Sequence, residues 1–269
     1  MRPGRRRTVL VGAVAGTALL FTGCGGDRKA DPTAEPGGND GGGLNGEVIV
    51  SAAASLTDVF GELAESFTAE HPGARIELNL GSSGQLSTQI VEGAPADVAA
   101  FADTVPMDRL AQEGLLAGPA QVFATNRLTI VTPPGNPAGI DGVADLGGVR
   151  TLSLCVTSAP CGAYAERVLS VAGVEVDEGR VSRGQDVRAT LGAVSRGDAD
   201  AAIVYETDAV AAGDAVETVP LPDSSEVLAQ YPIAVIAGIT ASEVSEAFVE
   251  HVRGTTGQRI LRRAGFGAP

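Results

Sequence analysis

Residues 48–58 read Val-Ile-Val-Ser-Ala-Ala-Ala-Ser-Leu-Thr-Asp, and this stretch decides the fold. The β-branched run at 48–50 predicts a buried strand that is covered on both faces. After Ser55, apolar residues recur every three or four positions as far as Phe67, which predicts a helix with one buried face. Ser55 is therefore expected to begin that helix, with Asp58 three residues later in an acidic variant of the capping box.

The small residues between this strand and this helix predict an anion-binding turn. Backbone N–H groups in the first turn of a helix have no partner within the helix, and the helix dipole adds positive partial charge there. The sequence leaves a simpler role open, in which the Ser55 hydroxyl only caps its own helix.

Composition narrows the classes of protein that the chain can belong to. Its 269 residues can bury a large core and predict two lobes. Aromatic residues make up 4% and Trp is absent, which argues against carbohydrate and nucleic-acid binders that stack flat ligands. The 19 basic and 33 acidic residues give a formal charge of −14. Because no basic stripe follows the N-terminal region, we expect no nucleic-acid partner.

Residues 1–23 are expected to be an export signal rather than part of the fold. A basic start precedes an apolar run at 9–21, and Leu20-Phe21-Thr22-Gly23-Cys24 resembles a lipoprotein signal-peptidase site. The mature chain would then begin at Cys24, with lipid on its thiol and amine. An uncleaved anchor and an ordinary signal peptide are the alternatives, but a run of about 13 apolar residues is too short to span a bilayer.

Residues 24–46 are expected to form a flexible tether. They are rich in Gly, Asp and Pro and have almost no apolar side chains, so burial cannot offset the entropy of ordering them. A tether of this length reaches about 25 Å. Cleavage would remove four of the 19 basic residues and leave 15 against 33 acidic ones, a net charge of −18 for the mature chain.

The remaining sequence alternates between strand and helix patterns, which predicts an α/β fold with parallel sheets. Gly81-Ser82-Ser83-Gly84 repeats the arrangement of a strand, a small polar turn and a helix start, and Asp103 is expected to cap a further helix. Strands are expected at 48–52, 75–80, 98–101, 127–131, 149–154, 201–204 and 231–236. Helices are expected at 56–70, from 85, after 103, after 162, after 186, at 241–253 and ending near 263.

Two cysteines, Cys155 and Cys161, remain once Cys24 carries lipid, and in an exported chain they predict one disulfide. The rival interpretation is a catalytic thiol at a helix start, where the dipole lowers the thiol pKa.

An exported hydrolase that uses Ser83 or Cys161 would also need a base. The chain has two histidines: His71 is expected to be solvated at a helix end, and His251 to lie on the surface. Gln85 replaces the second Gly of a Gly-x-Ser-x-Gly nucleophile elbow around Ser83.

Several short motifs, in order over residues 47–269, resemble the molybdate-binding component of an ABC importer. They are Ala52-Ala53-Ala54-Ser55-Leu56-Thr57, Gly81-Ser82-Ser83-Gly84, Gly93-Ala94-Pro95-Ala96-Asp97-Val98, Asp186-Val187-Arg188, Ile203-Val204-Tyr205 with Asp208, Tyr231-Pro232-Ile233 and Ala264-Gly265-Phe266.

The resemblance implies the two-lobed fold of type II periplasmic binding proteins. Each lobe would be a mostly parallel sheet flanked by helices, with the ligand in a cleft between the lobes. Lobe 1 would contain residues 47–125 and 232–269, and lobe 2 residues 126–231. The hinge would be the crossover segments at 124–127 and 230–232.

The resemblance also implies the ligand set of a tetrahedral oxyanion. Ser55 and Ser83 would bind it from lobe 1, and the backbone N–H groups at Cys161 and Val187 with the Tyr205 phenol from lobe 2. Molybdenum would be bound only as the oxyanion, with no other metal and no cofactor. These donors are uncharged and would reject ligands whose protons need acceptors. A Cys155–Cys161 bridge need not remove a main-chain contact.

By the same resemblance, the chain would bind molybdate, and tungstate with it, at the extracytoplasmic face of the plasma membrane. It would deliver to an ABC permease with its ATPase subunit. The anchor would be the lipid on Cys24, and a monomer is expected because one ligand-clasping chain suffices for delivery. A receptor for sulfate or phosphate and a structural lipoprotein remain alternatives. Arg188 would be either a charge clamp for the ligand or half of an ion pair within lobe 2.

Overall fold

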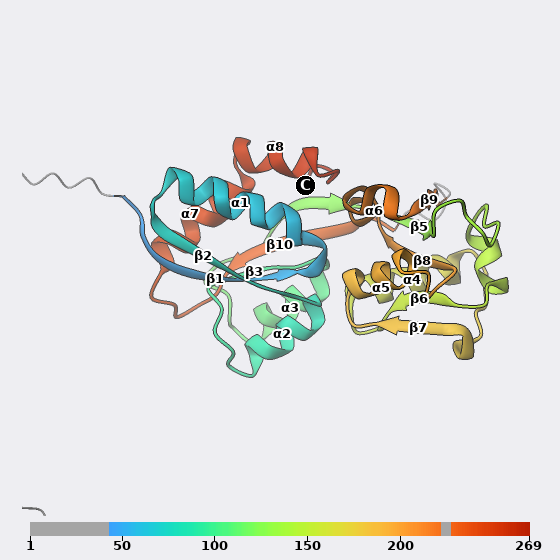
Figure 1. Cartoon of the computed structure of the whole chain (residues 1–269). Helices are drawn as coiled ribbons and strands as arrows, with labels where there is room; N and C mark the ends of the chain where they lie inside the picture. The colour runs from blue at the N-terminus through green and yellow to red at the C-terminus, as the bar shows by residue number, and fades with distance from the viewer. Residues whose placement is uncertain (1–42, 222–226) are drawn as a thin grey trace, which may run out of the picture. The chain divides into compact units, whose positions relative to one another are not determined.

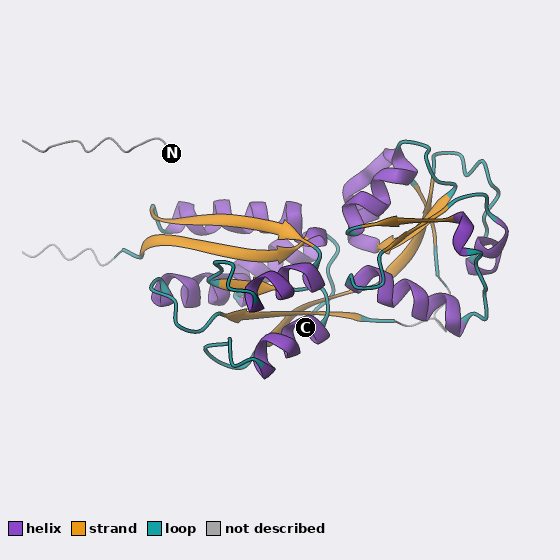
Figure 2. Cartoon of the chain, turned by 90° about the horizontal axis from the view of Figure 1, so that it is seen from below, coloured by secondary structure: helices purple, strands orange, loops and turns teal. Residues whose placement is uncertain are grey.

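The computed structural model describes residues 43–221 and 227–269, which contain two five-stranded sheets, each flanked by helices. The first sheet has the order β2-β1-β3-β10-β4 and the second has the order β7-β6-β8-β5-β9. In Figure 2, helices flank the strands of both sheets. We call the first sheet with its helices lobe 1 (43–126 and 229–269) and the second lobe 2 (128–221). The predicted α/β class is confirmed.

Lobe 1 is built on β1, which pairs in parallel with β2 and β3. Its strands are β1 Asn45–Ala53, β2 Gly73–Gly81, β3 Val98–Ala100, β4 Gln121–Asn126 and β10 Ala229–Val235. Its helices are α1 Thr57–Glu70, α2 Ser83–Val91, α3 Thr104–Gln112, α7 Ser242–Arg253 and α8 Thr255–Arg263. Figure 1 shows α1 and α7 over one face of the sheet and α2 and α3 over the other.

The two faces of the lobe 1 sheet carry separate apolar cores. Phe60 and Phe67 of α1 pack edge-on against Phe248 of α7 and complete the larger core. Leu86 of α2 and Met107 of α3 belong to the smaller core on the other face. The apolar face of α1 is therefore buried, as the helical spacing of residues 56–67 predicted.

Lobe 2 is built around β8, which pairs in parallel with β6 and antiparallel with β5. Its strands are β5 Leu128–Thr132, β6 Leu152–Cys155, β7 Val181–Gly184, β8 Ala201–Tyr205 and β9 Glu217–Val219. Its helices are α4 Pro160–Val171, α5 Val187–Ser195 and α6 Glu206–Ala212.

Neither sheet is as parallel as the sequence predicted. β10 runs antiparallel to both β3 and β4, and β5 runs antiparallel to both β8 and β9. Both are strands by which the chain enters a lobe from the other one. They do not follow a helix on the same sheet, so the right-handed βαβ connection does not require them to be parallel.

The chain passes from lobe 1 to lobe 2 between Asn126 and Leu128, where β4 ends and β5 begins. It returns between Val219 and Ala229, a connection that includes the undescribed residues 222–226. No helix within the described residues is long and apolar enough to cross a membrane. The predicted signal at 1–23, the lipid-bearing Cys24 and the tether up to residue 42 lie outside the described residues.

Candidate functional site

A small cavity lies where the two lobes meet, and the five residues singled out in the sequence all line it. About 10 Å³ of it is open to the centre of a water-sized sphere, which is the room that about one water needs. A ligand of more than a few atoms would enter while the lobes are apart. The lining residues are Ala53, Ala54, Ser55, Gly81, Ser82, Ser83, Ala102, Ala159, Pro160, Cys161, Asp186, Val187 and Tyr205.

Helix N-termini from both lobes converge on this cavity. α2 begins at Ser83, α4 at Pro160 and α5 at Val187, and a 3₁₀ turn at Ala54–Leu56 precedes α1. The first N–H groups of a helix have no partner within it, and each N-terminus carries about half a positive charge. These N-termini bring positive partial charge to the cavity; among the described residues, no Lys or Arg side chain lines it, and Asp186 is the one acidic residue that does.

Ser55 does not cap α1, and the predicted capping box with Asp58 is wrong. The N-cap of α1 is Leu56, and no side chain caps the helix. Ser55 lies in the preceding 3₁₀ turn, and its Oγ is 3.0 Å from the phenol oxygen of Tyr231. Ser55 lines the cavity, and the residue is 8% exposed.

Ser83 is the first residue of α2 and is buried. The backbone N–H of Ala102 donates to its Oγ at 3.1 Å. An N–H group only donates, so this bond leaves the Ser83 hydroxyl hydrogen free for an acceptor in the cavity.

Tyr205 ends β8, and its phenol is buried without a hydrogen-bond partner among the described residues. Burial raises the pKa of Tyr205 well above its usual value, so the phenol remains protonated. A buried O–H without a partner is costly. Because Tyr205 lines the cavity, its O–H group is available to donate to a ligand there.

Cys161 lies in the first turn of α4 and forms a disulfide with Cys155 at the end of β6. With both sulfurs oxidised, neither cysteine is a thiol nucleophile. The bridge closes the loop 156–160 and so holds the backbone N–H of Cys161 at the cavity. Thr190 of α5 donates to Cys155 Sγ at 3.3 Å, which ties the bridge to a second helix that begins at the cavity.

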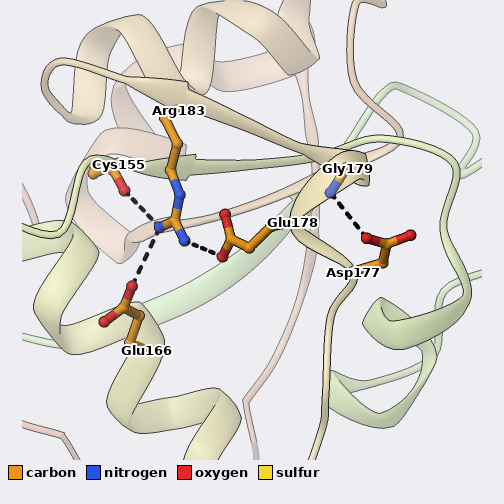
Figure 3. A network of polar contacts seen from close by, with 6 residues as sticks. All are labelled: Cys155, Glu166, Asp177, Glu178, Gly179 and Arg183. Atoms are coloured by element: carbon orange, nitrogen blue, oxygen red, sulfur yellow. Dashed lines mark hydrogen bonds and ion pairs between the residues drawn. The ribbon is translucent and has the colours of Figure 1, made fainter.

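The same loop is supported from behind by Arg183 of β7. Its guanidinium donates to the Cys155 carbonyl at 3.1 Å and pairs with Glu166 of α4 at 3.4 Å and Glu178 at 2.6 Å. Figure 3 shows these contacts together with the separate turn in which Asp177 accepts from the Gly179 N–H. Arg183 thus holds both sides of the loop 156–160, because Cys155 precedes the loop and Glu166 lies on the helix that follows the loop.

Val187 begins α5, which is capped by the Asp186 carboxylate through the N–H of Ala189. The next residue, Arg188, forms an ion pair with Asp58 of α1. This pair joins lobe 2 to lobe 1, so the expected alternative of a pair within lobe 2 is wrong. Arg188 does not line the cavity, and the contact that sequence reasoning missed is a bridge between lobes.

A second contact between the lobes requires a glycine. A Cβ placed on Gly84 of α2 would lie 2.2 Å from the carbonyl oxygen of Ser158 in the loop before α4. Backbone oxygens cannot move aside as a flexible side chain does, so only glycine permits this approach. The motif Gly81-Ser82-Ser83-Gly84 signalled a tight turn in the sequence, and the structure shows what its last glycine faces.

Both histidines lie far from the cavity, at the opposite end of α1. His71 and His251 pack on the Phe67 ring, with centroid distances of 4.7 and 5.5 Å. A 14-residue helix is about 21 Å long, so Ser55 and these rings are separated by about that distance. The expectation that His251 lies on the surface is wrong: its side chain is 7% exposed, and burial lowers its pKa.

Asp208 is a buried carboxyl group near the cavity that sequence reasoning named only as part of a motif. It lies in the first turn of α6, and its Oδ2 has no hydrogen-bond partner among the described residues. Burial raises its pKa to about 7, against the opposing effect of the Arg188 guanidinium.

Comparison with known proteins relates the chain to transport proteins. Residues 48–267 match the family described as bacterial extracellular solute-binding protein. The molybdate-binding protein ModA of Mycobacterium tuberculosis is 36% identical over 255 residues, covering 94% of this chain and 96% of that protein.

Two solved structures share the fold. The periplasmic molybdate-binding protein of Azotobacter vinelandii has a TM-score of 0.74 at 22% identity, covering 82% of this chain and 99% of that one. The sulfate-binding protein SubI of Mycobacterium tuberculosis has a TM-score of 0.71 at 21% identity, covering 82% and 86%.

Proposed function

Because the chain belongs to the bacterial extracellular solute-binding proteins, we propose that it binds molybdate, and tungstate with it, for delivery to an ABC importer. The observation that carries this proposal is the convergence of uncharged donors on one small cavity. Ser55, Ser83 and Tyr205 bring hydroxyl groups to it, and Cys161 and Val187 bring backbone N–H groups. The 36% identity to a protein named for molybdate binding supports the same ligand.

A tetrahedral dianion has four oxygens that only accept hydrogen bonds, and this donor set matches it. The free hydrogens of Ser83 and Tyr205 follow from the bond to Ala102 and from the unpartnered phenol. Five charge-assisted bonds at about 1.5–3 kcal/mol each give a gross gain of about 8–15 kcal/mol. After the costs of ordering and closure, a dissociation constant between about micromolar and nanomolar follows.

The acidic charge of the chain does not oppose this proposal. Beyond about 8 Å, salt at physiological strength screens the net charge, whereas the helix N-termini act at contact. The Asp186 carboxylate, which belongs to a lining residue, accepts from the Ala189 N–H as the cap of α5. Its charge is thus directed partly to its own helix.

Sulfate is the second candidate ligand, since it shares the charge and shape of molybdate. The fold is also that of a protein named for sulfate binding, although at 21% identity this likeness shows the fold alone. Discrimination between the two anions would depend on the size of the cavity when the lobes close on the ligand.

The proposed role includes the cell envelope and the transporter. Lipid on Cys24 would hold the chain at the extracytoplasmic face of the membrane, and the tether would let lobes 1 and 2 reach an ABC permease with its ATPase subunit. A single chain supplies both sides of the cavity, so a monomer suffices for binding. Neither a cofactor nor catalysis is part of this proposal, and molybdenum enters only as the oxyanion.

Titration calorimetry of the purified protein with molybdate, tungstate, sulfate and phosphate tests the proposal. Molybdate and tungstate should bind with micromolar or tighter dissociation constants, and sulfate at least about tenfold more weakly. Ser83→Ala and Tyr205→Phe should each weaken molybdate binding by about tenfold. Sulfate binding as tight as that of molybdate would transfer the proposal to sulfate, and no binding of any oxyanion would refute it.

A serine-directed covalent probe tests the remaining alternative of an exported hydrolase. The folded protein should not be labelled at Ser83, because both histidines lie on Phe67 at the far end of α1. Labelling at Ser83 would instead favour the hydrolase.

A further inference from the structure

Behind Ser55, a chain of hydrogen bonds leads away from the cavity to the crossover between the lobes. Ser55 Oγ lies 3.0 Å from the Tyr231 phenol oxygen, and Asn126 Nδ2 donates to the same oxygen at 3.3 Å. Asn126 Nδ2 also donates to Thr207 Oγ1 of α6 at 2.8 Å. All of these groups are buried. Tyr231 belongs to lobe 1 and Thr207 to lobe 2, so Asn126 contacts both sides of the crossover.

The direction of each bond in this chain follows from the orientation of the Asn126 amide. The backbone N–H of Arg127 donates to Asn126 Oδ1 at 2.9 Å, which fixes the amide with its NH₂ group toward Tyr231 and Thr207. A flipped amide would place two donors against each other. The Tyr231 oxygen must therefore accept from Asn126.

The phenol hydrogen of Tyr231 then has one acceptor among the described residues. Within the described residues, the hydrogen bonds of this phenol are to Asn126 and Ser55. Since Asn126 donates, Ser55 Oγ is the acceptor for the Tyr231 hydrogen. Burial raises the pKa of Tyr231 far above its usual value, so the hydrogen is retained.

With its oxygen engaged from behind, Ser55 has its own hydrogen left for the cavity that it lines. Ser83 has the same arrangement, because the Ala102 N–H donates to its oxygen. Ser55 and Ser83 thus each receive a hydrogen from the protein and offer one to a ligand. Such chains also polarise each member, which strengthens the terminal donor.

We infer that Asn126 and Tyr231 are positioning residues that fix Ser55 as a donor, and that they thereby select oxyanions that carry no proton. This inference rests on the proposed oxyanion binding and extends it to two residues that do not line the cavity. A proton on hydrogen phosphate needs an acceptor, whereas Ser55, which accepts the Tyr231 hydrogen, presents its own hydrogen to the cavity. Molybdate and sulfate have no such proton.

The test compares proton-free and proton-bearing dianions in variants that change the direction of the chain. At about pH 8.5, phosphate is a dianion that retains one proton, so changes in charge affect it and sulfate alike. Asn126→Asp exchanges the donor for an acceptor, so Tyr231 should donate to the introduced carboxylate and Ser55 to Tyr231. Tyr231→Phe removes the donor behind Ser55 without adding charge and keeps the ring that packs on Phe123 and Phe266.

In both variants, the affinity for phosphate relative to molybdate and sulfate should rise by about tenfold or more. Asn79→Asp is the matched control, because Asn79 Nδ2 donates to Ser51 within lobe 1 and lines no part of the cavity. Tyr164→Phe controls for the loss of a phenol. Both controls should keep the wild-type ratios within about twofold.

Circular dichroism and thermal unfolding establish that each variant is folded before titration. Ratios that stay at the wild-type value in both variants, or phosphate that stays undetectable in both, would overturn the inference while leaving oxyanion binding intact. Failure of the wild-type protein to bind any oxyanion would instead refute the proposed function.

Discussion

Arg188 of lobe 2 forms an ion pair with Asp58 of lobe 1, so a charged contact joins the two lobes. On lobe 2, Arg188 directly follows Val187, which begins α5. On lobe 1, Asp58 is in the first turn of α1, directly after the 3₁₀ turn that carries Ser55. The pair therefore connects two segments that line the cavity. Both side chains are more than a third exposed, so the pair is partly screened by solvent.

Loss of this pair should speed ligand release. Exposed pairs contribute about 0.2–1 kcal/mol, so Asp58→Asn or Arg188→Gln should raise the molybdate dissociation rate by up to about fivefold. Stopped-flow measurement at low and high salt checks this, and the effect should shrink as salt rises. Arg150→Gln is the control, because Arg150 pairs with Asp200 within lobe 2. An equal effect from the control would contradict a role for the bridge between lobes.

Gly84 should be required for the lobes to close. In Gly84→Ala, the added carbon would lie 2.2 Å from the Ser158 carbonyl oxygen, so the lobes cannot approach as they do here. Molybdate affinity should fall by about tenfold or more, measured by calorimetry. Gly61→Ala in α1 meets nothing within 4 Å and should leave affinity unchanged while stabilising the helix. Wild-type affinity in Gly84→Ala would show that ligand binding does not need this contact.

Reduction of the Cys155–Cys161 bridge should weaken both the fold and the site. A bridge across a six-residue separation is expected to contribute about 2 kcal/mol to the free energy of unfolding. Molybdate binding should also weaken, since the Cys161 N–H would lose its fixed place at the cavity. Urea unfolding and calorimetry of the Cys155→Ser, Cys161→Ser double variant check both effects. If stability falls while affinity stays at the wild-type value, the bridge holds the fold but not the donor.

Asp208 should make stability depend on pH. Burial raises its pKa to about 7. The folded state therefore keeps the Asp208 proton up to about pH 7, whereas the unfolded state loses it near pH 4. The contribution of Asp208 is fully present below about pH 4 and is lost as pH rises through about 7. Asp208→Asn should therefore gain stability relative to wild type between about pH 4 and pH 8, by a few kcal/mol.

Urea unfolding of both proteins at several pH values measures this difference. Asp214→Asn, at an exposed position, is the control and should show no such trend. Parallel pH profiles for wild type and Asp208→Asn would show that Asp208 is not the titrating group.

The local elements were predictable because their signals lie within a few residues. Asp103 is the N-cap of α3 as expected, accepting from the Val105 N–H, and the helical spacing after Ser55 fixed the buried face of α1. Short strands escaped prediction: β7 has one apolar residue among four, and β9 has three residues in all. Such segments become strands only because a neighbouring strand pairs with them.

The structure brings the five residues singled out in the sequence to one cavity, but the hydrogen-bond network around them could not be predicted. The small-residue turns identified Ser55 and Ser83, because a helix start is a local pattern. The bond between Ser55 and Tyr231 joins residues 176 positions apart, and that between Asp58 and Arg188 joins residues 130 apart. No local pattern specifies such contacts. They follow from the way in which the chain crosses twice between the lobes.

The most direct test of the central claim is an anomalous-diffraction map of crystals grown with molybdate. The account predicts one molybdenum peak in the cavity, with oxygens about 2.7–3.1 Å from the donors of Ser55, Ser83, Cys161, Val187 and Tyr205. A peak elsewhere on the molecule, or a cavity without molybdenum in crystals that contain it, would contradict the account.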